Sequence, residues 1–190
     1  MPIKSSQINY KPQGKDRSGW LFQQLLKLTA DIVCTQEQYL VIDADTVFIR
    51  PVVFEKNSKT ILYFSDEHHL PYFKAYKKMI GLSPLSPFSF VAHHMLIDRK
   101  KTAELKKRLE KKSKQLWYQS IINQINTNET SGFSEFETYG NFLLRFYPKK
   151  IYLNYWFNLS LPREDLVNIN NLEKQYSPKY ISISFHAHNK

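Results

Sequence analysis

The sequence has little cysteine and no long apolar run, so it lacks the features of disulfide frameworks and of membrane spans. Its 190 residues include one cysteine, Cys34, so an internal disulfide is excluded and nothing indicates an oxidising compartment. No apolar run reaches the ~18 residues that a membrane-spanning helix needs, and the first residues lack the apolar stretch of a signal peptide. We therefore expect a cytoplasmic protein.

Acidic residues are also scarce. The chain has 17 Asp and Glu against 27 Lys and Arg, which gives a net charge of +10 at pH 7. Much of the excess lies in residues 100–114, where lysines and leucines are interleaved at helical spacing. This pattern is typical of a solvated helix face, and it also suits a surface that binds anionic lipid at the inner face of a membrane. Nucleic acid is not an expected partner, because there is no zinc-finger, RNA-recognition or phosphate-loop pattern.

The length and the 42% hydrophobic content allow one compact core but not two independent ones. Strand-like and helical segments alternate, which predicts an α/β fold, a three-layer mixed sheet flanked by helices. We expect helices at 20–33, 72–80, 102–126 with a break near 114, and 134–146, strands at 40–43, 47–49, 61–64, 88–97, 151–153 and 181–186, and a loop at 168–178.

The tripeptide Asp43-Ala44-Asp45 follows the apolar run 39–42. An apolar strand that ends in two carboxylates predicts a site at its carboxyl end, where open α/β sheets bind ligands. Residues i and i+2 point to the same side, so Asp43 and Asp45 can share one hard divalent cation, Mn²⁺ or Mg²⁺, with a substrate diphosphate completing the oxygen shell. A polar hairpin turn without metal is the alternative.

Four segments, at 19–28, 39–46, 89–95 and 134–141, resemble in this order the successive blocks of an uncharacterised family of bacterial glycosyltransferase-like proteins. That family is similar to nucleotide-sugar transferases of the A-type fold, which carry an Asp-x-Asp motif. The resemblance implies a hexosyltransferase-like activity that depends on Mn²⁺ or Mg²⁺. The donor would be a nucleotide-diphosphate sugar, and the acceptor an unknown glycan or a lipid-linked molecule.

One feature departs from the A-type pattern. These transferases usually place a nucleotide-binding βαβ region of on the order of 100 residues before the motif, whereas only 42 residues precede Asp43 here, and 1–18 contains no strand-like run. We expect residues 1–190 to form a single partial domain, truncated at its N-terminal side. Activity would then require the missing strands or strands from another subunit.

Further candidates for the donor site lie on the helix expected at 20–33. Gln23, Gln24 and Lys27 gather on one side of that helix, where they can reach a phosphate or a sugar together with Asp43. A plain solvent face is the alternative.

All six histidines occur in close pairs. We assign His93 and His94, from the third block of the resemblance, to acceptor binding. Strand alternation puts His186 and His188 on one face, and some A-type transferases take a late histidine as a third metal ligand, so His186 is our candidate beside Asp43 and Asp45. A polar C-terminal strand is the alternative. Zinc is not supported, since there is no Cys pair and no His-Glu-x-x-His helix.

Glu135 is the candidate catalytic base. Ser134 and Glu137 form a helix-capping pattern, which gives Glu137 a structural role and leaves Glu135 without one. In inverting transferases a carboxylate removes the acceptor hydroxyl proton, while a cation held by Asp45 acts on the leaving diphosphate. Asp66-Glu67, after the strand expected at 61–64, is a second candidate carboxylate pair.

Two other function classes stay open from the sequence. A metal-dependent phosphoesterase or nuclease would use Asp43, Asp45, Glu67 and a histidine, and the positive charge would attract a polyanion. The other class is a non-catalytic remnant that only binds a partner or a membrane.

Overall fold

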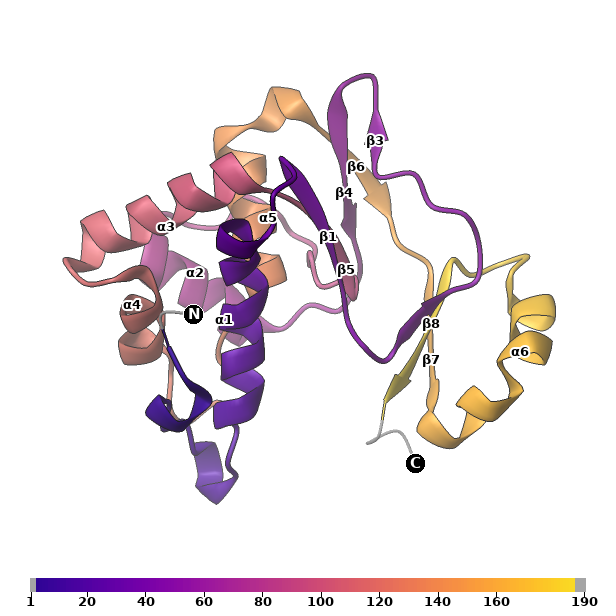
Figure 1. Ribbon diagram of the computed structural model, residues 1–190, viewed down its shortest axis with the longest axis horizontal. Helices are drawn as coiled ribbons and strands as arrows, with labels where there is room; N and C mark the ends of the chain where they lie inside the picture. The colour runs from indigo at the N-terminus through magenta and orange to yellow at the C-terminus, as the bar shows by residue number, and fades with distance from the viewer. Residues whose placement is uncertain (1–2, 187–190) are drawn as a thin grey trace.

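The computed structural model describes residues 3–186 and shows a mixed α/β protein (Figure 1), which confirms the predicted class. The helices are α1 (Ser18–Val33), α2 (Leu70–Ile80), α3 (Arg99–Ser113), α4 (Trp117–Gln124), α5 (Glu135–Phe146) and α6 (Ile169–Tyr176). The strands are β1 (Gln38–Ile42), β2 (Thr46–Phe48), β3 (Glu55–Lys56), β4 (Lys59–Phe64), β5 (His94–Asp98), β6 (Ile151–Tyr155), β7 (Asn158–Pro162) and β8 (Ser182–His186).

In the described part of the chain, the strands form three small sheets rather than one continuous sheet. β1 pairs antiparallel with β5, β4 lies between β3 and a parallel β6, and β8 lies between an antiparallel β2 and a parallel β7. A tight turn at Ala44 and Asp45, closed by the hydrogen bond from Thr46 N to Asp43 O, separates β1 from β2. This turn sends β2 to the C-terminal strand β8, so the expected single sheet is divided at the Asp-x-Asp motif.

Some of the predicted bounds of helices and strands are confirmed by the structure, and others are wrong. The break near 114 is confirmed, because Lys114 ends α3 with a left-handed φ of 59°. The loop expected at 168–178 is wrong, since 169–176 is helix α6, whose Leu172 and Tyr176 pack against the Ile183 cluster of β8. The strand expected at 88–97 begins only at His94. No helix within residues 3–186 is long and apolar enough to cross a bilayer.

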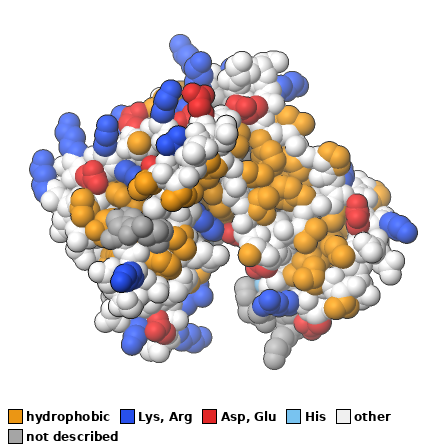
Figure 2. All heavy atoms as spheres, in the orientation of Figure 1, with side chains coloured by type: hydrophobic (Ala, Val, Ile, Leu, Met, Phe, Trp, Pro, Cys, Tyr) orange, Lys and Arg blue, Asp and Glu red, His pale blue; other side chains and the backbone are white. Residues whose placement is uncertain are grey.

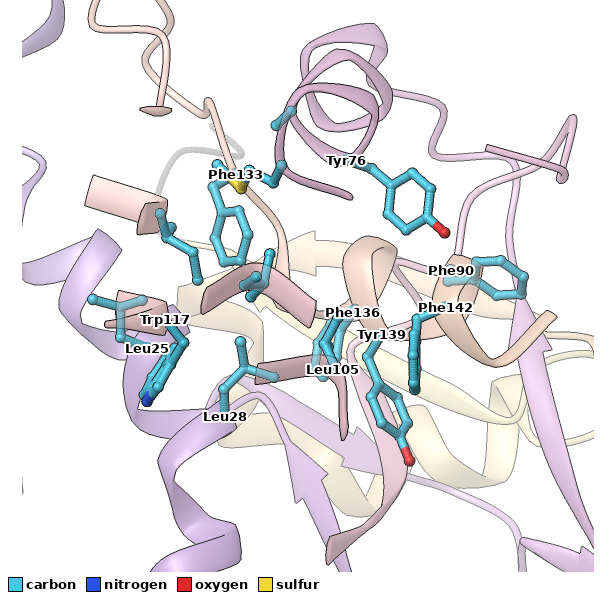
Figure 3. Close-up of a cluster of buried hydrophobic side chains, with 14 of the residues drawn as sticks. Leu25, Leu28, Tyr76, Phe90, Leu105, Trp117, Phe133, Phe136, Tyr139 and Phe142 are labelled. Atoms are coloured by element: carbon cyan, nitrogen blue, oxygen red, sulfur yellow. The ribbon is translucent and has the colours of Figure 1, made fainter. Parts of the chain in front are cut away.

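The main core lies among helices α1 to α5 and the strands β1 and β5. Figure 1 shows these helices gathered on one side of the strands, whereas α6 lies beside β7 and β8 at the other end of the molecule. Leu25 and Leu28 of α1, Leu105 of α3 and Tyr139 of α5 are fully buried there (Figure 3). This packing places the polar side of α1 beside the start of α5, where Lys27 contacts Glu135.

Gly140 lets α5 approach the segment that precedes β5. A Cβ atom built on Gly140 would lie 2.3 Å from Cγ of Phe90, closer than any real contact. Glu137, one turn earlier on α5, accepts hydrogen bonds from Ser89 Oγ at 2.8 Å and Phe90 N at 3.0 Å. The start of α5 is thereby joined to residues 89–93, and both contribute to the site described next.

Candidate active site

A cleft of about 560 Å³ separates the α1–α5 side of the molecule from β8 and the 3₁₀ turn Arg163–Asn168. Figure 2 shows the surface hollowed between these two parts. Nearly all the side chains that the sequence singled out line this cleft: Gln23, Gln24, Lys27, Asp43, Asp45, Glu67, His93, Glu135 and His186.

Lys27 joins two of the predicted acids. Its Nζ lies 2.5 Å from Oδ1 of Asp43 and 2.7 Å from Oε1 of Glu135, and its side chain is only 11% exposed. Burial by itself would lower the pKa of Lys27, but the negative charges of Glu135 and Asp43 outweigh it and raise that pKa. Lys27 is therefore a permanent cation between a strand end and a helix start.

Glu135 is the first residue of α5 and is 1% exposed. Burial raises the pKa of its carboxyl to about 7, although the Lys27 ammonium acts in the opposite direction. Oε1 faces Lys27, whereas Oε2 makes no hydrogen bond to any residue within 3–186. A buried carboxylate with one unsatisfied oxygen at a cleft wall is suited to accept a proton near neutral pH.

His93 links two carboxylates on the floor of the cleft. Its Nε2 lies 2.9 Å from Oε1 of Glu67, and its Nδ1 lies 3.6 Å from Oδ2 of Asp43. Burial lowers the pKa of His93, but hydrogen bonds to Asp43 and Glu67 prevail and raise it to about 9, so the ring is an imidazolium at neutral pH. Its left-handed φ of 61° is uncommon for a residue with a Cβ and marks a constrained position.

Asp43 therefore faces two cations. Burial raises the pKa of its carboxyl, but the hydrogen bond from His93 and the charge of Lys27 hold it below its ordinary value. The position of the carboxylate follows from β1, because Asp43 N donates to His93 O at 2.8 Å and so extends the β1–β5 ladder by one residue. Both Asp43 oxygens lie against protein cations, so its predicted role as a metal ligand stays a prediction.

Asp45 lies next to His186. Nδ1 of His186 is 3.2 Å from Oδ2 of Asp45, and the backbone N of Phe185 donates to Asp45 O at 2.8 Å. The pairing of β2 with β8 thus brings His186 to the Asp-x-Asp turn over a separation of 141 residues. The Asp45 side chain is 45% exposed to the cleft. His188 lies outside the described residues.

A metal site needs more ligands than these two. Within residues 3–186, no group of three or more His, Cys, Asp or Glu side chains is arranged to hold a metal ion. The open carboxylate of Asp45 and the imidazole of His186 fit a cation that takes its other ligands from water and from a bound diphosphate. Such a two-ligand site would depend on substrate for tight binding.

His94 does not reach the cleft. Its ring is 1% exposed and lies 3.9 Å from the ring of Trp156 and 5.2 Å from that of Tyr63, measured between centroids. Nδ1 hydrogen-bonds to Ala92 O at 2.7 Å, and burial lowers the pKa of the ring to about 4. His94 is thus a neutral core side chain and, unlike Glu135, is not part of the cleft lining.

Several cleft residues gave no signal in the sequence. Arg17 lies over the Trp20 ring, 4.7 Å from its centroid, and donates from Nε to Thr130 O at 3.0 Å. Tyr72 and Arg163 also line the cleft. Each belongs to a segment whose local pattern is ordinary, so only the tertiary arrangement shows that these residues face the cleft.

The fold and the cleft define an α/β protein with a charged, partly buried carboxylate site. Residues 4–167 match the model of a family described as a family of unknown function, DUF6492. The chain belongs to this family. No curated protein matches the chain.

Proposed function

We propose that this protein is a metal-dependent glycosyltransferase-like enzyme of the A-type fold that moves a sugar from a nucleotide-diphosphate donor to a hydroxyl acceptor. One observation carries the proposal: the buried carboxylate of Glu135, with a free Oε2 and a pKa raised by burial to about 7, shares a cleft with the Asp45–His186 pair. A base and a cation site on one cleft are the two parts that such a transfer needs.

Asp45 and His186 would hold Mn²⁺ or Mg²⁺, which when bound supplies Lewis-acid stabilisation of the leaving diphosphate. Gln23 and Gln24, on the same wall as Lys27, would bind the donor by hydrogen bonds. Asp43 holds Lys27 and His93 in place, so the orientation of both side chains at the cleft is fixed before substrate arrives.

In the chemical step, Glu135 would take the proton of the acceptor hydroxyl through one bridging water, because its unpaired Oε2 has almost no exposed surface. The acceptor oxygen then forms a bond to the anomeric carbon, and the bond from that carbon to the diphosphate oxygen breaks, with the electron pair leaving on the diphosphate. Lys27 stabilises the ionised form of Glu135 before the step and would lose one favourable contact as Glu135 becomes protonated. This sequence inverts the configuration at the anomeric carbon.

The binding half of the proposal is tested by calorimetric titration of Mn²⁺ with uridine or guanosine diphosphate. Asp45→Asn removes a charge from a hard-cation site, so we expect metal-dependent nucleotide binding to weaken by at least about tenfold, with little change in fold stability. Asp66→Asn is the matched control, since Asp66 is exposed and does not line the cleft. Equal binding by Asp45→Asn and wild type would refute the cation role.

The catalytic half is tested with a panel of nucleotide-diphosphate sugars, by following release of the nucleoside diphosphate in the presence of candidate acceptors. Glu135→Gln should lower turnover by about 10²-fold or more without weakening donor binding, because it removes the base and not the donor contacts. Metal-dependent hydrolysis of bis(p-nitrophenyl) phosphate, with no sugar transfer, would instead support a phosphoesterase and overturn the proposal.

A further inference from the structure

Helix α3 carries a row of lysines that the cleft does not use. Eight of its 15 residues are basic and two are acidic. Lys100, Lys107 and Lys111 recur at intervals of seven and four, so they share one face of the helix, and all three are exposed. Figure 2 shows blue side chains along the edge of the molecule that α3 occupies in Figure 1.

The positive charge of this row is not compensated. Glu104 pairs with Arg108 at 2.7 Å, and Glu110 accepts a hydrogen bond from Trp117 N at 3.2 Å. Lys107 and Lys111 form no ion pair within residues 3–186, and the partner of Lys100 is a Glu37 side chain 3.7 Å away, with both side chains almost fully exposed. Such exposed ion pairs contribute little to the stability of the fold, so the lysine charge is available to an external partner.

The helix dipole does not explain the row. The first turn of α3 has no acidic residue and carries Lys100, although the positive end of the helix dipole disfavours a cation there. Lys107 lies in the middle of the helix, where the dipole gives it no advantage. Only Lys111, in the last turn, suits the helix itself.

The C-terminal end of α3 contacts the C-terminal end of α2, and exposed apolar side chains follow both helices. Nζ of Lys112 donates to Lys78 O, and its Cε lies 3.2 Å from the position of a Cβ on Gly81. The residues that follow the two helices, Leu82 and Leu116, are 41% and 51% exposed. We define the α2–α3 patch as Lys77, Lys78, Lys100, Lys107, Lys111, Lys112, Lys114, Leu82 and Leu116.

We propose that the α2–α3 patch binds the headgroup surface of an anionic lipid bilayer. Exposed lysines beside protruding leucines combine attraction to lipid phosphates with shallow insertion at the acyl boundary. A surface for single-stranded nucleic acid would instead offer aromatic side chains for base stacking, and the exposed large apolar residues between positions 77 and 116 are all leucines. No residue of α3 lines the cleft, so binding leaves the cleft free, and this inference does not depend on the proposed catalytic function.

The test is flotation of the full chain with vesicles of equal parts phosphatidylglycerol and phosphatidylcholine, at about 0.1 M salt. Each lysine near an anionic surface contributes about 1 kcal/mol, roughly fivefold in partitioning. The triple variant Lys100→Gln, Lys107→Gln, Lys111→Gln should therefore bind about a hundredfold more weakly. The matched control replaces three exposed lysines outside the patch, Lys11, Lys15 and Lys174, with glutamine and should lose far less.

A second variant tests the apolar part of the patch with every charge kept. Replacing Leu82 and Leu116 with serine should lower partitioning by about tenfold, because less apolar area enters the bilayer. Three outcomes would overturn the proposal: equal loss in the patch and control triples, equal binding to pure phosphatidylcholine vesicles, or failure of the wild type to float. Binding of a short RNA duplex with the same lysine dependence, and no vesicle binding, would identify a nucleic-acid surface instead.

Discussion

At the scale of single residues, Lys27 lies between two carboxylates, with its Nζ 2.5 Å from Oδ1 of Asp43 and 2.7 Å from Oε1 of Glu135. Because all three side chains are largely buried, Glu135 depends on that ammonium for its charge balance, whereas Asp43 is also paired with His93. Removing one partner of a buried ion pair leaves an uncompensated charge. This lowers the free energy of unfolding more than replacing the whole pair with neutral groups does.

We therefore expect Lys27→Met to lower the free energy of unfolding at pH 7 by about 3 kcal/mol. Adding Glu135→Gln to Lys27→Met should restore part of that loss, because the unpaired acid is then neutral. Urea denaturation of the two single variants and the double variant measures this coupling. Lys107→Met, at an exposed site on α3, is the control and should change the free energy of unfolding by less than about 0.5 kcal/mol. Strictly additive effects of the two changes would show that the pair is not coupled.

At the scale of secondary-structure elements, the contact between α5 and residues 89–93 positions the carboxylate site. Gly140→Ala would gain helix propensity, worth about 1 kcal/mol, but its methyl group would collide with Phe90. We expect the collision to prevail, with a net loss of about 1–3 kcal/mol in the free energy of unfolding, as is usual when a packed core is overfilled.

Gly19→Ala on α1 provides the matched comparison, because a Cβ there has no neighbour within 4 Å. That substitution should stabilise the protein by about 0.5 kcal/mol, because it lowers the conformational entropy of the unfolded chain. Urea denaturation of the two alanine variants gives their free energies of unfolding. The difference between them separates the effect of helix propensity from the effect of core packing. If both variants were stabilised to the same extent, the close approach of α5 to Phe90 would be disproved.

At the scale of the whole molecule, stability should fall as the pH rises from about 5 to 8. Burial raises the pKa of both Glu135 and Glu137 to about 7 from an ordinary value near 4.5. The folded state therefore holds protons that the unfolded state releases, so this stability is fully present below about pH 4.5 and is lost as the pH passes 7. His93, with a pKa raised to about 9, acts in the same direction above about pH 6.5.

The measurement is the free energy of unfolding at pH 5, 6, 7 and 8. Glu137→Gln removes one titrating acid that lies outside the cleft, so its curve should be flatter between pH 5 and 7 than that of the wild type. An equally steep curve would mean that Glu137 stays ionised in the fold, held by its hydrogen bonds from Ser89, Phe90 and Asn141.

Helix positions could be inferred from local sequence, because spacing, capping and breaks act over a few residues. The Leu21, Leu25 and Leu28 repeat places α1, and the Ser134 cap, which accepts from Glu137 N at 3.1 Å, begins α5. The end of β1 at Ile42, one residue before the expected end at Asp43, follows in the same way from an apolar run that meets a carboxylate. Helix α6 was missed because its sequence is mostly polar and its apolar residues become meaningful only against β8.

The meeting of side chains in the cleft was decided by the tertiary structure. Helix packing brings Lys27 to Glu135, which lies 108 residues later in the sequence. The pairing of β2 with β8 brings Asp45 to His186, which lies 141 residues later. The adjacent His93 and His94 look equivalent in sequence, yet one faces the cleft and the other the core. Long-range pairing and register set these contacts, and local periodicity carries no information about either.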